Sequence, residues 1–179
     1  MDPEFPSVTK LEAARRQLET AALLYFNSRD AISMHTLVAA AYQILEDLAT
    51  REGTKMLIEQ SIVSSLGEEI ARELRPYIRR IQNYLKHADR SNEPDSLEYS
   101  PQLTELMLLD AYGKLTQLTG EQPRILLAFE NWFFMNHLEM LDRFPPQKQV
   151  MRQAKSMLGH LDRITFLREF MSNTCTLRA

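Results

Sequence analysis

Cysteine and glycine are scarce in this chain of 179 residues, which contains one cysteine and five glycines. No segment alternates β-branched and polar residues with a period of two, so strands are not indicated and the sequence predicts an all-α fold. The single cysteine, Cys175, excludes an internal disulfide and a thiolate zinc site. Such cysteine usage is typical of a reducing compartment, and we expect a cytoplasmic protein.

Long apolar runs and cofactor motifs are also missing. The longest apolar runs, Leu37–Leu45 and Ile125–Phe129, fall far below the roughly 18 residues that a membrane-spanning helix needs. The chain lacks the phosphate loops GxGxxG and GxxxxGK(S/T), the hydrolase elbow GxSxG and a pair of histidines four apart. None of the four histidines follows a carboxylate by three residues, as a ferritin-like metal site requires. We therefore expect no membrane association, no metal and no cofactor.

Length and charge fit one domain with a local functional site. Apolar residues make up 44% of the chain, and the net charge is −3. The mean field would not attract nucleic acid or an anionic membrane, so any anion site must be local. Met1–Phe5 (MDPEF) resemble a translated cloning-site scar, and residues 175–179 form a polar tail. We assign residues 6–174 to a single helical domain.

The spacing of apolar residues predicts an up-and-down bundle of about seven helices. These are expected over Lys10–Phe26, Ser33–Arg51, Glu68–His87, Gln102–Thr119, Pro123–Arg143, Gln147–Leu158 and Asp162–Met171. A shorter helix is expected over Lys55–Ser64, and Asp89–Pro101 should be the longest loop. Pro76 should bend or split its helix, because proline has no backbone N–H. The Pro123–Arg143 helix is apolar on every side, which indicates either a central helix or a subunit interface.

Positive charge gathers near the end of the Glu68–His87 helix. At about 100° per residue, six polar residues there fall within an arc of roughly 120°. We call these six residues the basic stripe: Arg79, Arg80, Asn83, Lys86, His87 and Arg90. Acids on this arc occur only at its start, at Glu68 and Glu69. A cationic face with one imidazole can hold a phosphate and move a proton near neutral pH, whereas the alternative is an ordinary solvated face.

A second polar set lies on the Ser33–Arg51 helix. His35, Tyr42 and Glu46 share one side of that helix beside its apolar face. We interpret this set, the polar seam, as structural, with members that satisfy one another's hydrogen bonds. The alternative is a pocket in which His35 and Tyr42 bind a small ligand.

Two segments carry a resemblance to known families. Met34–Leu45 (MHTLVAAAYQIL) and Asn83–Arg90 (NYLKHADR) resemble a group of uncharacterised bacterial proteins that share SxHTLxxAA and NxxKHADR segments. This likeness covers most of Leu11–Gly120. More distantly, arginine, asparagine and histidine near a helix end resemble the HEPN superfamily. Its active members are metal-independent ribonucleases that act as dimers, with arginine and histidine of both subunits lining one cleft.

The HEPN-like resemblance implies roles for individual residues. His87 matches the motif histidine and Asn83 the polar residue four positions before it. An arginine usually precedes that polar residue directly, whereas here the position holds Gln82, and Arg80 fits only the looser spacing. In this interpretation His87 takes a proton from a ribose 2′-hydroxyl while Arg80 stabilises charge on the phosphate. Phosphate binding then falls to Arg79, Lys86 and Arg90.

These observations leave three hypotheses. The first is an HEPN-like protein that binds RNA or nucleotide phosphate through the basic stripe, as an active or a degenerate ribonuclease, with an antitoxin-type protein partner. The second is a non-catalytic homodimeric interaction protein whose apolar helices form the interface and whose basic stripe is merely solvated. The third is a small-ligand sensor built on the polar seam.

Overall fold

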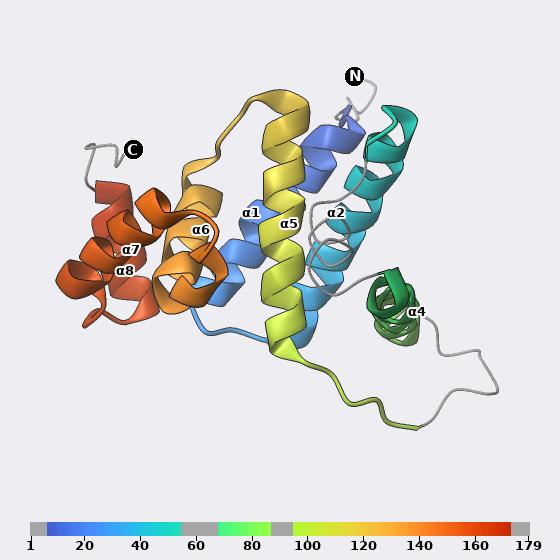
Figure 1. Ribbon diagram of the computed structural model, residues 1–179. Helices are drawn as coiled ribbons and strands as arrows, with labels where there is room; N and C mark the ends of the chain where they lie inside the picture. Colours follow the sequence, from blue (N-terminus) through green and yellow to red (C-terminus); the bar gives the residue numbers. More distant parts are fainter. Residues whose placement is uncertain (1–6, 55–67, 87–94, 173–179) are drawn as a thin grey trace, which may run out of the picture.

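Every described element of the chain is helical (Figure 1). The computed structural model describes residues 7–54, 68–86 and 95–172, and the side chains of all of these except 68–75. The helices are α1 Lys10–Phe26, α2 Ala31–Arg51, α4 Glu68–Tyr84, α5 Pro101–Thr119, α6 Arg124–Asn136, the 3-10 helix η1 Leu138–Leu141, α7 Pro145–Leu158 and α8 Arg163–Ser172. The predicted all-α bundle is confirmed. None of these helices combines the length and apolar character needed to cross a bilayer.

Local sequence signals set the ends of α2 and α5. The carboxylate of Asp30 accepts hydrogen bonds from the backbone N–H groups of Ile32 and Ser33, so α2 begins at Ala31, two residues earlier than predicted. Gly120 ends α5 with a positive φ of 72°, a conformation that costs glycine little. The predicted stop of this helix is therefore confirmed.

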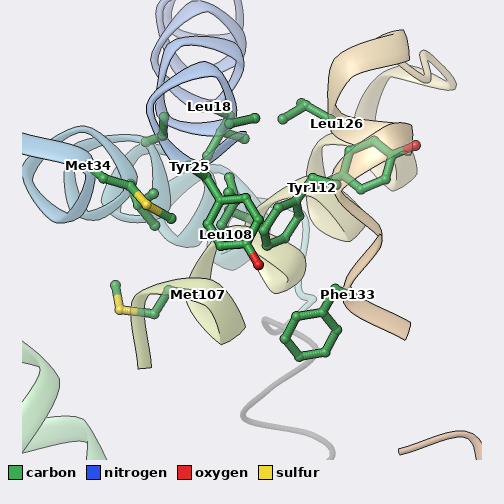
Figure 2. Close-up of a cluster of buried hydrophobic side chains, with 14 of the residues drawn as sticks. Leu18, Tyr25, Met34, Met107, Leu108, Tyr112, Leu126 and Phe133 are labelled. Atoms are coloured by element: carbon green, nitrogen blue, oxygen red, sulfur yellow. The ribbon is translucent and has the colours of Figure 1, made fainter. Parts of the chain in front are cut away.

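Three long helices form the centre of the bundle. α1 packs along α2, and α2 packs along α5. Small side chains allow the close approach of α1 and α2, and the fully or almost fully buried ones are Ala14, Ala21, Ala22, Ala39 and Ala41. Figure 2 shows how Leu18, Met34 and Leu108 from these three helices meet in one apolar cluster. This cluster supplies most of the burial that holds the three helices together.

The aromatic helix α6 is a central element. Leu126, Phe129 and Phe133 are buried, and the other apolar side chains of α6 are at least half-buried. α6 contacts α1 on one side and α7 and α8 on the other. Of the two predicted roles for this helix, the described contacts therefore favour the central one.

α6 ends earlier than predicted. The sequence predicts a helix as far as Arg143, but α6 stops at Asn136, and η1 follows it. The side-chain amide of Asn136 donates to the carbonyl of Trp132 at 2.8 Å, the same acceptor that the backbone N–H of residue 136 uses in a helix. His137 then leaves the helical conformation, with φ −129° and ψ 56°. A local side-chain hydrogen bond thus accompanies the end of a helix that apolar periodicity alone would continue.

α4 crosses the bundle. Figure 1 views α4 along its axis and α5 from the side, so the two helices do not run alongside each other. Ile81 is buried in the core, and Ile78 and Leu85 pack against it. The helix is continuous through Pro76, so of the two predicted effects of this proline, a bend or a split, the split does not occur. The helix predicted over Lys55–Ser64 lies outside the described residues.

Candidate functional site

The described part of the basic stripe lies on the exposed side of α4. Arg79, Arg80 and Lys86 are exposed and Asn83 is half-buried, while Ile81 on the opposite side is fully buried. The predicted division of this helix into an apolar and a cationic face is therefore present over these residues. The remaining two members of the stripe, His87 and Arg90, lie outside the described residues.

The three exposed cations of the basic stripe have no acidic partner among the described side chains. The described ion pairs are elsewhere, and they join Arg15 to Glu19, Arg16 to Glu12, His137 to Glu139 and Lys148 to Asp142. A helix usually neutralises such a face with acids three or four residues away. The local potential at this end of α4 is therefore positive, although the chain as a whole is negative.

Gln82 has a different environment from the stripe. Its side chain is only 7% exposed, and it lies on the buried side of α4 beside Ile81. At about 100° per residue, position 82 is about 160° from Arg80 around the helix. The same position is only about 60° from Arg79 and 40° from Lys86, so Gln82 borders the cationic face although its own side chain is buried. Among the described residues of the stripe, Arg79, Arg80 and Lys86 are the exposed cations.

Two members of the polar seam, His35 and Tyr42, form hydrogen bonds with residues of α5. The ring of His35 is fully buried, and its Nδ1 lies 2.7 Å from Thr104 Oγ1. The Tyr42 hydroxyl donates to Asp110 Oδ2 at 2.8 Å. The prediction that seam residues satisfy each other is wrong, because residues seven apart on a helix are separated by about 10 Å along its axis. The third member, Glu46, is half-buried and accepts from the side chain of Gln43 at 3.3 Å.

A chain of hydrogen bonds fixes the tautomer of His35. The Tyr99 hydroxyl donates to the carbonyl of Ala31 at 3.1 Å, because that oxygen can only accept. The hydroxyl of Thr104, 3.0 Å from Tyr99, must then donate to Tyr99 and accept from His35 Nδ1–H. This leaves Nε2 of the neutral ring as an acceptor, and that buried atom has no hydrogen-bond partner among the described residues.

The positive charge of Lys86 affects the pKa of His35, and these two residues belong to the two segments that carry the resemblance. Burial, together with the smaller effect of the positive charge of Lys86, lowers the pKa of His35 to about 4. His35 belongs to the SxHTLxxAA segment, and Lys86 belongs to the NxxKHADR segment. The two segments therefore come within electrostatic range of each other, where the end of α4 meets the beginning of α2.

α5 buries three polar residues that the sequence patterns did not reveal. Thr104, Asp110 and Lys114 are all buried. The Lys114 ammonium donates to Gln117 Oε1 at 2.7 Å and lies 3.5 Å from Thr54 Oγ1. The signal that could have revealed them is an aspartate and a lysine four apart inside an otherwise apolar helix, because buried polar groups require partners.

A surface hollow of about 470 Å³ lies at the start of α7, away from α4. It is lined by Asp142, Pro145, Lys148, Gln149, Arg152 and Gln153. Within the described side chains, no three histidine, cysteine or carboxylate groups gather closely enough to hold a metal ion. Comparison of the chain with protein-family models, curated proteins and solved structures gave no significant match.

Proposed function

We propose that the protein binds a phosphate of RNA or of a nucleotide on the basic stripe of α4. The observation that carries this proposal is the exposure of Arg79 and Arg80 on α4 and of Lys86 in the turn after it, with no described acid to neutralise them. A guanidinium group binds phosphate oxygens through two parallel N–H donors, and an ammonium adds a mobile point charge. Because the chain is negative overall, binding depends on this face and not on the mean charge.

The resemblance to HEPN proteins extends this proposal to metal-independent cleavage of RNA. His87 would accept the proton of a ribose 2′-hydroxyl, whose oxygen attacks the adjacent phosphorus as the bond to the 5′ oxygen breaks. Arg80 would stabilise the negative charge on the phosphate, and the leaving oxygen would take up a proton. The absence of an arginine at Gln82 supports the alternative of a degenerate member that binds without cleaving.

Binding is tested by the fluorescence anisotropy of a labelled RNA oligonucleotide. We expect Arg80→Ala and Lys86→Ala each to weaken binding and to reduce the dependence of log Kd on log salt concentration by about one. The matched control is Arg168→Ala, which removes an exposed arginine of α8 and should leave the affinity unchanged. Equal affinities for all four proteins, or no binding by the parent, would end the proposal.

Cleavage is tested separately with the same RNA. We expect His87→Ala to retain binding and to abolish cleavage, whereas His160→Ala, a change at an exposed histidine after α7, should leave both unchanged. Equal cleavage by His87→Ala and the parent would refute the role of this imidazole. Binding without cleavage by the parent would identify a degenerate member.

The second candidate function is that of a homodimeric interaction protein. The observation in its favour is a set of exposed apolar side chains on η1, the following turn and α7, namely Met140, Phe144 and Met157. The HEPN-like resemblance also implies a dimer, as well as an antitoxin-type partner. Sedimentation equilibrium of the parent and of Phe144→Ser tests this candidate. A dimer that weakens on substitution supports it, and a parent that remains monomeric at high concentration refutes it.

A further inference from the structure

An aromatic side chain lies beside the cations on α4. Tyr77 is 38% exposed and makes no ring contact or hydrogen bond with any described side chain. Arg80 and Tyr84 follow it three and seven residues later, so the three fall within an arc of roughly 60° on the helix. We call Tyr77, Arg80 and Tyr84 the stacking row. A solvent-facing row of two tyrosines and one arginine thus borders the basic stripe.

The second tyrosine of this row has a fixed position. The Tyr84 hydroxyl donates to the main-chain oxygen of Asp95 at 2.9 Å, and its ring is half-buried. Ile81, at the centre of the buried face of α4, anchors the helix to the core between the two tyrosines. Flat aromatic and guanidinium surfaces are therefore held on an anchored helix, which reduces the entropy lost when a ligand binds to them.

The other edge of the same exposed face carries the remaining cations. Arg79 and Lys86 lie about 100° or more around the helix from Arg80. They are exposed and have no described acidic partner. One edge of the face thus carries two aromatic rings, and the other carries the cations Arg79 and Lys86.

We propose that the nucleic acid bound by α4 is single-stranded, with unpaired bases stacked on the stacking row and backbone phosphates held by Arg79 and Lys86. This inference rests on the phosphate-binding function proposed above and specifies its substrate class. Proteins that bind single strands combine a cationic track with exposed aromatic side chains, because every base has a flat face that can stack. In a duplex the bases are already stacked on one another and Tyr77 would have no partner.

The test compares a labelled 12-nucleotide RNA with the duplex formed by the same strand, both measured by fluorescence anisotropy over a series of salt concentrations. The parent should bind the single strand at least tenfold more tightly than the duplex. Tyr77→Ala should weaken single-strand binding by about 5- to 100-fold without changing the salt dependence, since a tyrosine carries no charge. Tyr77→Trp should retain the affinity, because it keeps a flat ring.

Two controls distinguish a failure of this inference from a failure of the phosphate-binding function proposed above. Leu23→Ala removes a more exposed apolar side chain on α1 and should leave binding unchanged. Thermal melting of Tyr77→Ala should match that of the parent, and Tyr77→Trp provides a folded comparison if it does not. Equal binding of duplex and single strand, with no effect of Tyr77→Ala, would overturn the inference, while weakened binding by Lys86→Ala would still support the basic stripe. Failure of the parent to bind either RNA would overturn both.

Discussion

The α2–α5 interface and the α6–α8 region bury different kinds of side chain. All five buried polar or charged residues of the described chain lie on α2, α4 or α5, namely His35, Gln82, Thr104, Asp110 and Lys114. The α6–α8 region instead packs aromatic rings, with the centroids of Trp132 and Phe166 5.0 Å apart. Hydrogen bonds fix the register of two helices, whereas apolar contacts are not directional. The polar interface is therefore the more specific part of the core, and it is the part that α4 adjoins.

The largest expected effect belongs to the aromatic region. Phe166 is 2% exposed and its ring lies near those of Phe26, Trp132 and Phe170. Phe166→Ala should lower the free energy of unfolding by about 3 to 5 kcal/mol, because it removes buried apolar surface and leaves a cavity. Urea denaturation monitored by circular dichroism measures this loss. Met157→Ala, at a side chain that is 70% exposed, should change stability by less than about 0.5 kcal/mol.

The next largest effect is a dependence of stability on pH, and it comes from His35 in the interface between α2 and α5. The pKa of His35 is about 4 in the folded protein and has a reference value of 6.5. Between these values the unfolded chain binds a proton that the folded chain does not. Stability should therefore fall by up to about 3 kcal/mol as the pH drops from 6.5 to 4, with no contribution from His35 above that window.

The control for this prediction is the difference between the parent and His35→Gln in denaturation series at several pH values. Burial raises the pKa values of Glu105 and Glu130, so these carboxyl groups change stability in the opposite direction as the pH falls. The difference between the two proteins isolates His35, because both retain these acids. Parallel curves for the two proteins would contradict the prediction. In the parent at neutral pH, nitrogen NMR of the ring should find the proton on Nδ1.

The smallest of the three effects concerns a single hydroxyl group. Tyr42→Phe keeps the ring but removes the donor to Asp110, so it should lower the free energy of unfolding by about 2 kcal/mol. Tyr77→Phe, at an exposed tyrosine, should have almost no effect on stability. A similar result for both variants in urea denaturation would mean that the polar interface contributes no more than surface residues do.

Sequence patterns predicted the helices better than they predicted the pairing of polar side chains. Apolar spacing gave both ends of α1, and Gly120 gave the end of α5, because these signals are local. The predicted end of α6 was wrong. The helix ends at Asn136, whose side chain forms a local hydrogen bond, and the spacing of apolar residues gives no indication of such a bond. The partners of His35 and Tyr42 lie on α5, 69 and 68 residues away along the chain. One sequence without contacts cannot specify such pairs.

The same reasoning applies to the candidate site. The exposure of Arg79, Arg80 and Lys86 was predicted from helical angles, since they lie within eight residues of one another on α4 and the turn that follows it. The proximity of Lys86 to His35 was not predicted, because it depends on how α4 crosses the bundle. Tyr77 was missed for another reason: as a single aromatic residue, it gave no indication of whether it lies in the core or in solvent.

The long separation between α2 and α5 also has a consequence for the order of folding. α1 and α2 are joined by a short turn, so they can associate early, whereas the contacts of His35 and Tyr42 require closure of a loop of almost 70 residues. Until α5 packs against α2, the surface of α2 that α5 will cover is exposed to water. An imidazole and a phenol hydroxyl on that surface make it less apolar, and a partly folded chain is thereby less prone to associate with other copies.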